Sequence, residues 1–210
     1  NISFMIQCSI NACGEICQPA LEKTSKDGKK FLSFTVKIPI SGRNGSISDL
    51  FLSVSVDGDY SQIGKYSLGR KVSFKGKMIP RKYKGLVYYN VHSEGDILTA
   101  DPECSPFITG TMDFKGKIGK KVQDLTDKKG RSFQSFSAFS SNKTGQETEY
   151  IWIHFMNFHL TETNKVSPEQ SVAISGDFHF NVYKDVISLE CIVQDISQWE
   201  WSKEGSTTDK

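Results

Sequence analysis

An internal duplication constrains the fold of this chain more than any other feature of its sequence. Residues 26–36 align with residues 128–138 at a spacing of 102 positions, with Gly28 matching Gly130 and Phe34 matching Phe136. Residues 72–76 then align with 172–176, and 83–84 with 183–184, at a spacing of 100 positions. Three blocks in the same order are hard to attribute to chance, so the chain is expected to contain two copies of one structural unit.

Each copy contains five short runs with the alternation and β-branched content of strands. They cover residues 3–16, 30–40, 49–56, 71–79 and 86–92 in the first copy, and 109–122, 131–140, 149–158, 171–180 and 186–193 in the second. Asp59 as an N-cap and Gly69 as a C-terminal glycine predict a short helix between the third and fourth runs of the first copy. In the second copy a polar connection at 161–169 takes the place of this helix.

Five antiparallel strands with a helix between the third and fourth is the element order of an OB-fold barrel. The sequence therefore predicts an all-β protein of two tandem OB-fold (five-stranded Greek-key) barrels. The expected division is an N-terminal barrel at 1–100, a linker with two prolines at 101–108, a C-terminal barrel at 109–203 and a frayed tail at 204–210. A single β-sandwich is the alternative, but it would not explain the duplication.

Positive charge is concentrated locally, because the net charge of the 210 residues is only +2. Residues 1–105 hold 14 Lys or Arg against 10 Asp or Glu, whereas residues 106–210 hold 12 against 14. Between Arg70 and Lys84 there are seven Lys or Arg and no acidic residue, within a predicted β-hairpin that also carries Tyr83 and Tyr88. Cations beside exposed rings suit a phosphate backbone with unstacked bases. A solvated hairpin with lysines that only keep it soluble is the alternative interpretation.

Strand alternation separates core side chains from outward ones. Leu32, Phe34, Val36 and Ile38 share one parity and are expected in the core, which leaves Phe31 outside. In the same way Phe51 lies on the polar parity of its strand. In the second copy Ile151, Ile153 and Phe155 form the core set, so that Tyr150, Trp152 and His154 face outward, and Phe133 and Phe139 share the outward parity of the preceding strand.

Two segments resemble bacterial single-stranded-DNA-binding proteins. Tyr66-Ser-Leu-Gly-Arg-Lys-Val-Ser-Phe-Lys-Gly-Lys-Met78 is similar to a Leu-x-Lys-Gly-x-x-Val-x-Ile-x-Gly-x-Leu block of that family, and Thr148-Glu-Tyr-Ile-Trp-Ile-His-Phe155 is similar to its third strand. The resemblance extends to phage proteins of the same kind and covers most of both copies. Members usually carry one barrel per chain and an acidic-hydrophobic tip, whereas this sequence has two fused copies and ends Glu204-Gly-Ser-Thr-Thr-Asp-Lys210.

The resemblance and the outward residues together predict non-sequence-specific binding of single-stranded DNA, in replication, recombination or repair. The resemblance also implies self-assembly into a dimer and contacts with replication or recombination proteins. The candidate nucleic-acid-binding residues are Lys29, Lys30, Phe31, Phe51, Arg70, Lys75, Arg81, Lys82, Tyr83, Lys84, Tyr88, Lys128, Lys129, Arg131, Phe133, Phe139, Tyr150, Trp152, His154 and Lys184. A protein-interaction module, or RNA or oligosaccharide binding in the same groove, are the alternatives.

Catalysis, metal binding and membrane insertion are not expected. The four histidines lie at no catalytic spacing, and no phosphate-binding loop or nucleophile motif is present. Cys8, Cys13 and Cys17 lack the spacing and the nearby histidine of a zinc site, so buried free thiols and no cofactor are expected. Five cysteines, an odd number, favour a reducing compartment, and no apolar stretch approaches the length of a membrane span. A cytoplasmic protein is therefore expected.

Overall fold

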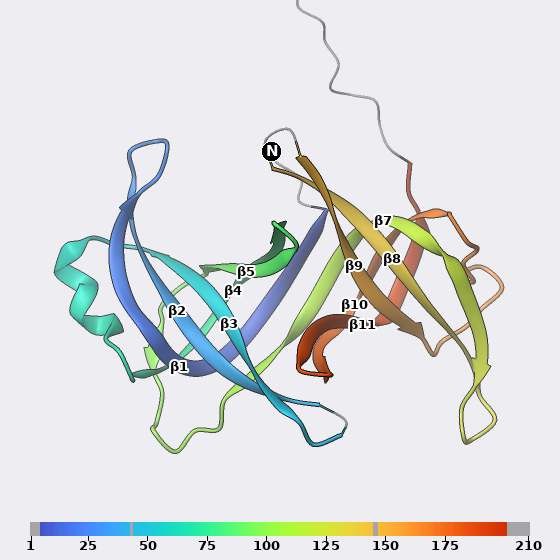
Figure 1. The fold of residues 1–210 in the computed structure, drawn as a ribbon, viewed down its shortest axis with the longest axis horizontal. Coiled ribbons are helices and arrows are strands. Elements are labelled where there is room, and N and C mark those ends of the chain that lie inside the picture. Colours follow the sequence, from blue (N-terminus) through green and yellow to red (C-terminus); the bar gives the residue numbers. More distant parts are fainter. Residues whose placement is uncertain (1–4, 43, 145–146, 201–210) are drawn as a thin grey trace, which may run out of the picture.

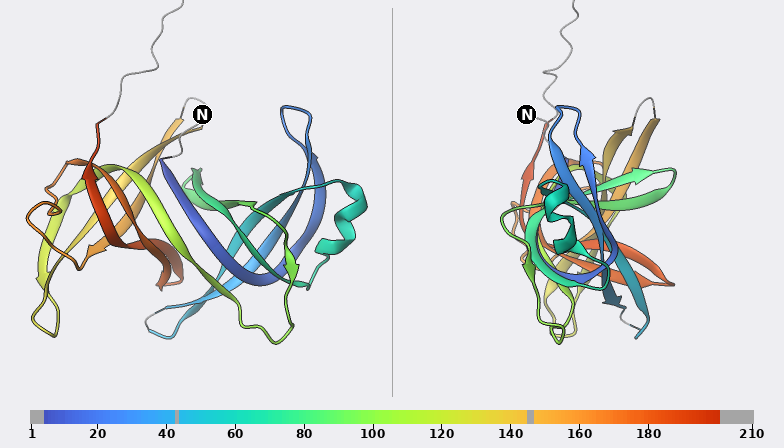
Figure 2. Two further views of the ribbon diagram at one scale, coloured as in Figure 1. Left: turned by 180° about the vertical axis from the view of Figure 1, so that it is seen from behind. Right: turned by 90° about the vertical axis from the view of Figure 1, so that its left-hand side faces the viewer.

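The chain folds into two barrels that lie side by side (Figures 1 and 2). The computed structural model describes residues 5–42, 44–144 and 147–200. The first barrel consists of β1 (Ile6–Thr24), β2 (Lys30–Ser41), β3 (Ile47–Asp57), β4 (Lys71–Tyr83) and β5 (Leu86–Ser93), with the 3-10 helix η1 (Tyr60–Tyr66) between β3 and β4. The second consists of β7 (Phe107–Thr126), β8 (Ser132–Thr144), β9 (Glu147–Asn157), β10 (Ser171–Tyr183) and β11 (Val186–Gln198). A short strand, β6 (Leu98–Thr99), pairs with the start of β4.

Both barrels close with the strand order of an OB-fold, which confirms the predicted fold class. In the first barrel the order is β1-β2-β3-β5-β4, and β4 pairs again with β1; in the second it is β7-β8-β9-β11-β10, and β10 pairs again with β7. Among the described residues only the β3–β5 and β9–β11 pairings are parallel. The registers also repeat: Glu15 pairs with Lys37 in the first barrel, and Lys117 pairs with Phe139 in the second.

The two barrels join through an antiparallel ladder between β1 and β7. Ser9 and Thr111 are equivalent positions of the duplication, and they pair with each other at the centre of this ladder. The flanking pairs are Ile6 with Phe114 and Ala12 with Ile108. Ile6 is equivalent to Ile108 and Ala12 to Phe114, so each pair becomes the other when the two copies are exchanged. The junction is therefore pseudo-twofold symmetric, as an interface between two identical barrels would be.

Alternation along the strands builds the core as predicted. Leu32, Phe34, Val36 and Ile38 are buried, as are Ile151, Ile153 and Phe155. A second contact between the barrels comes from Tyr89 on β5, whose ring meets that of Phe180 on β10 edge to face at 5.1 Å. Burial raises the pKa of Tyr89.

Several predicted boundaries differ from the observed ones. β1 continues through bulges after Ile16 to Thr24, eight residues beyond the expected end, so that one strand serves both β4 and β2. The predicted helix is present and Asp59 caps it, accepting a hydrogen bond from the Ser61 amide, but it is a 3-10 helix whose C-cap is Ser67 rather than Gly69. In the second barrel residues 161–169 contain no helix, as expected.

The proposed domain limits stay a prediction. β6 ends at Thr99 and β7 begins at Phe107, within the stretch 101–108 that was expected to be a linker. The tail at 204–210 lies outside the described residues. Within the described ranges no helix is long and apolar enough to cross a membrane.

Candidate nucleic-acid interface

Three aromatic side chains gather on the outer face of β8 and β9. Phe139 lies directly opposite Trp152 in the β8–β9 ladder, and their ring centroids are 4.8 Å apart. Tyr150 meets Phe139 edge to face at 5.4 Å. Tyr150 is 48% exposed and Trp152 is 55% exposed. We call Phe139, Tyr150 and Trp152 the aromatic cluster. The ring of Phe139 contacts both of the others, and Tyr150 and Trp152 remain about half exposed to solvent.

A glycine on the neighbouring strand makes room for the largest of these rings. A Cβ atom at Gly119, on β7, would come within 3.1 Å of the Trp152 ring and 3.1 Å of the Ser137 carbonyl oxygen. Gly119 follows Ile118, where the β7–β8 register shifts through a bulge. The indole therefore lies against β7 in the space that a side chain would take.

The tip of the β4–β5 hairpin reaches across from the first barrel to this cluster. The Gly85 amide donates to Glu149 Oε1 at 3.0 Å, and Lys82 Nζ donates to the Tyr150 carbonyl oxygen at 3.3 Å. A small cleft of about 230 Å³ lies between the hairpin and β9, lined by Lys82, Tyr150 and Trp152 among others. Lys84 and Gly85 form the two-residue turn, both with positive φ (49° and 81°), as hairpins of this type require. A cation from one barrel thus lies beside aromatic rings of the other.

The equivalent surface of the first barrel has different chemistry. Phe51 is 53% exposed and lies opposite Lys37, whereas its counterpart Trp152 lies opposite Phe139. Asp49 stands where the second barrel has Tyr150. A larger cleft of about 780 Å³ adjoins Phe51; its apolar lining includes Leu86, Val87, Tyr88 and Val186, and its acidic lining is Asp49 and Asp185. Two carboxylates adjoin the apolar surface of this cleft, whereas Glu149 beside the aromatic cluster accepts a hydrogen bond from the Gly85 amide, so the cleft is less suited to phosphate.

The remaining predicted aromatics are accessible to different extents. Phe31 and Phe133 are half-buried, and Phe133 packs against Phe158 with ring centroids 4.9 Å apart. Tyr83 and Tyr88 are exposed on the β4–β5 hairpin. The ammonium of Lys84 lies 5.2 Å from the centroid of the Tyr83 ring, and Lys184 repeats this contact on Tyr183 at 5.3 Å.

Two of the predicted cations are engaged by carboxylates at the ends of the β1–β2 and β7–β8 hairpins. Lys30 pairs with Glu22 at 3.0 Å, and Arg131 Nε donates to Asp127 at 2.7 Å. Hydrogen bonds from Lys30 and from the Tyr60 amide lower the pKa of Glu22, and those from the backbone and side chain of Arg131 lower the pKa of Asp127. The other predicted lysines of these turns, Lys29, Lys128 and Lys129, are exposed.

The cations from Arg70 to Lys84 are spread along the length of β4, and their action as one stripe stays a prediction. Arg70 donates to the Lys65 carbonyl oxygen at 2.8 Å beside η1, and η1 lies at the end of the first barrel away from the second (Figures 1 and 2). Lys75 and Arg81 lie on the outer parity of β4, whereas Lys82 is on the other parity near the tip. The tip of the β4–β5 hairpin approaches the aromatic cluster through Lys82 and Gly85. The start of β4 lies at the other end of the strand.

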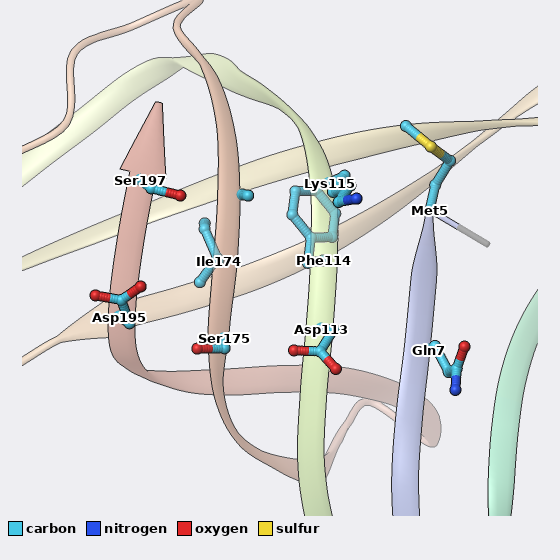
Figure 3. Close-up of a pocket in the computed structure, with 10 residues that line it drawn as sticks. Met5, Gln7, Asp113, Phe114, Lys115, Ile174, Ser175, Asp195 and Ser197 are labelled. Atoms are coloured by element: carbon cyan, nitrogen blue, oxygen red, sulfur yellow. The ribbon is translucent and has the colours of Figure 1, made fainter. Parts of the chain in front are cut away.

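The outer face beyond the β1–β7 ladder carries both acidic and basic side chains in the second barrel. Lys77 on β4 donates to Ser9 at 2.6 Å, and the position equivalent to Lys77 in the second barrel is Asp177. Figure 3 shows a pocket on this face, where Asp113 on β7 and Asp195 on β11 flank Ser175, and Lys115 also lines it. The pocket has a volume of about 330 Å³. The two carboxylates repel a polyanion and Lys115 attracts it, so this face offers less attraction to phosphate than a surface of cations alone.

His154 is held by polar neighbours rather than presented to solvent as a free ring. Its Nε2 lies 2.9 Å from Ser135 Oγ, and its Nδ1 lies 4.0 Å from the buried carboxylate of Glu190, which also contacts His179 at 2.9 Å. Within the described ranges no three His, Cys, Asp or Glu side chains are grouped to hold a metal ion.

Sequence reasoning missed several residues that line these surfaces. Nothing in the sequence marked Lys37 or Gly119 as part of a binding surface, because Lys37 is a single lysine on a strand and Gly119 is an isolated glycine. Their neighbours Phe51 and Trp152 were recognised from strand parity. The apolar rim of the larger cleft was also missed, since it combines hairpin ends from two barrels: Leu86, Val87, Val186 and Ile187.

Comparisons with known proteins find similarity among solved structures alone. No family model and no curated protein matches the sequence. A deletion mutant of the single-stranded DNA binding protein from Thermus aquaticus is 10% identical, with a TM-score of 0.49 over 94% of this chain and 97% of that one. The wild-type protein is 9% identical, with a TM-score of 0.49 over 93% and 94%. The mitochondrial single-stranded DNA binding protein Rim1 from S. cerevisiae is 19% identical, with a TM-score of 0.34 over 44% of this chain and 96% of that one. This chain is thus similar to single-stranded DNA binding proteins, over both barrels in one case and over a length near that of one barrel in the other.

Proposed function

We propose that this protein binds single-stranded DNA without sequence preference, and that bases stack on the aromatic cluster. The observation that carries the proposal is the pairing of Phe139 with the half-exposed Trp152, beside Tyr150 and Lys82. Every base offers a π-face, so stacking on such rings tolerates any sequence and contributes about 1–3 kcal/mol per base.

Phosphate contacts supply the second part of the binding energy. Lys82 and Lys84 at the hairpin tip and the exposed Lys128 and Lys129 at the β7–β8 turn are the cations proposed to follow the strand. Each phosphate neutralised releases counterions, so affinity should fall as salt rises. The low net charge favours such local contacts over a general attraction to polyanions.

The two barrels are proposed to contribute unequally. The second barrel offers three rings in contact, whereas the first offers Phe51 with Lys37 and two nearby carboxylates, Asp49 and Asp185. We therefore assign the stronger stacking site to the second barrel.

Titration of a labelled oligo-dT with the full chain tests the proposal. Fluorescence anisotropy at about 50 mM and about 200 mM salt should show binding that weakens with salt. A duplex of the same length should bind less, because its bases cannot reach the rings, and an oligo-U competitor reports any preference between DNA and RNA. Absence of oligo-dT binding at the lower salt concentration would end the proposal.

A protein-interaction module is the second candidate, and the cleft of about 780 Å³ favours it. Phe51, Leu86 and Val186 line this cleft together with acidic Asp49 and Asp185, a surface that suits a partner with apolar and basic side chains. Stoichiometric capture of a protein by the full chain, without affinity for nucleic acid, would support this candidate over the first. We also propose, with DNA binding as the function, that the protein forms a homodimer and acts in replication, recombination or repair. Its proposed location is the cytoplasm.

A further inference from the structure

Two cysteines from distant parts of the sequence face each other where the chain passes from the first barrel to the second. The thiol of Cys13 on β1 donates to Cys104 Sγ at 3.7 Å, across 91 positions of sequence. Cys13 is buried and Cys104 is half-buried. Of the other cysteines, Cys17 donates to the Thr35 carbonyl oxygen at 3.6 Å, toward β2.

The backbone around Cys104 is held in place by independent contacts. Its amide donates to the Asp101 carbonyl oxygen at 2.9 Å, and its carbonyl accepts from Lys71 Nζ at 2.8 Å. Lys71 also donates to the Pro102 carbonyl oxygen. On the other side Cys13 pairs with Ser73 on β4 and with Phe107 at the start of β7. Both thiols are therefore positioned by ordered backbone, which favours bond formation because little conformational freedom remains to be lost.

We propose that Cys13 and Cys104 are a modification site that forms a reversible intramolecular disulfide on exposure to a low-molecular-weight disulfide such as oxidised glutathione. The bond would fasten the connection between β6 and β7 to β1, at one end of the β1–β7 ladder (Figure 1). The loop that it closes contains β2 to β6 and the second half of β1, so most of the first barrel would lie within one covalent ring.

The reaction proceeds by two thiol–disulfide exchanges. The Cys104 thiolate attacks one sulfur of oxidised glutathione, and one glutathione thiolate leaves with the Cys104 proton. The Cys13 thiolate then attacks the Cys104 sulfur of the mixed disulfide, and the second glutathione thiolate leaves with the Cys13 proton. Two protein thiols are oxidised and one glutathione disulfide is reduced to two thiols.

Accessibility explains why Cys104 reacts first. Cys104 is half-buried, whereas burial, and then the hydrogen bond to Cys104, raise the pKa of Cys13 to about 11. Cys13 is therefore a weak nucleophile toward a molecule in solution and depends on its position beside Cys104. Cys8 and Cys191 are buried, and burial also raises their pKa values, in the case of Cys191 to about 12. They are not expected to react.

The test is oxidation of the full chain with oxidised glutathione, followed by unfolding, thiol counting and peptide mapping without reduction. The count should fall from five thiols to three, with one peptide pair joined through Cys13 and Cys104, and a reductant should restore five. Unmodified thiols throughout, a bridge through Cys17, or a bridge between two chains would each overturn the proposal. The mapping is done on the unaltered sequence, so it does not depend on a variant that folds.

Matched variants separate this pair from general thiol reactivity. Cys104→Ser should retain its four remaining thiols, whereas Cys17→Ser should lose two of its four, because Cys17 lies on the same strand but points toward β2. Equal behaviour of the two variants would contradict the assignment. Oxidation should also raise the thermal midpoint of the unaltered chain, and reductant should reverse the change.

Discussion

Phe139 and Trp152 lie directly opposite each other on β8 and β9, with ring centroids 4.8 Å apart, whereas the same two positions of the first barrel hold Lys37 and Phe51. The two copies share the same strand register, but the side chains at these paired positions differ in chemical character. A ring pair can hold a base upon its exposed faces, while a lone ring beside an ammonium gives one stacking face and one phosphate contact. The difference between the barrels leads to the first two predictions.

Replacement of Trp152 by Ala should weaken oligo-dT binding about 5- to 150-fold, the equivalent of roughly 1–3 kcal/mol for one stacked base. Phe51→Ala is the matched variant in the first barrel and should cost less. In a background with Trp199 and Trp201 replaced by Phe, DNA should quench the fluorescence of Trp152. Equal losses in the two Ala variants would show that the barrels contribute alike, even if binding itself persists.

Transfer of the second barrel's residues to the first should strengthen binding. Asp49→Tyr places a ring where the second barrel has Tyr150 and removes a carboxylate beside Phe51. Affinity for oligo-dT should rise severalfold, since one stacking face is gained and one repulsion is lost. Asp49→Asn removes the charge without adding a ring and should give a smaller gain. A Tyr variant that binds no better than the Asn variant would argue against stacking at this position.

Salt dependence should distinguish the hairpin tip from the far end of β4. Lys82→Gln should reduce the slope of log affinity against log salt by about 0.7, the value for one phosphate contact on a single strand. Arg70→Gln should leave the slope unchanged, because Arg70 lies beside η1, at the end of the first barrel away from the second. Anisotropy titrations at several salt concentrations measure both slopes. A larger change for Arg70 would place the phosphate path along β4 instead.

The junction between the barrels should depend on one glycine of β7. Gly110 has φ of 155°, and a Cβ atom there would lie 1.9 Å from the Ser9 carbonyl oxygen. Gly110→Ala should therefore lower the free energy of unfolding by about 2–4 kcal/mol, through backbone strain and disruption of the β1–β7 ladder. Denaturant unfolding measures the change. Gly64→Ala in η1, where the added methyl meets open space, is the control and should change stability little.

Local pattern was sufficient to predict the strands, their faces and the duplication. Alternation separated Phe34 from Phe31 and Ile153 from Trp152, because side chains of a strand point to opposite faces in turn and only one face meets the core. The turn glycines Gly28 and Gly130, both with φ near 78°, were recognisable from composition and position. Such features depend on neighbours in sequence, so a single sequence contains them.

Tertiary structure alone decided which of these outward residues act together. The ladder register placed Phe139 against Trp152 and Lys37 against Phe51, and the approach of two hairpin tips brought Lys82 to Tyr150 and Val186 to the cleft beside Phe51. The same holds for Cys13 and Cys104. These relationships join residues that are far apart in the chain, and pairing between strands, rather than the local pattern of any one strand, determines them.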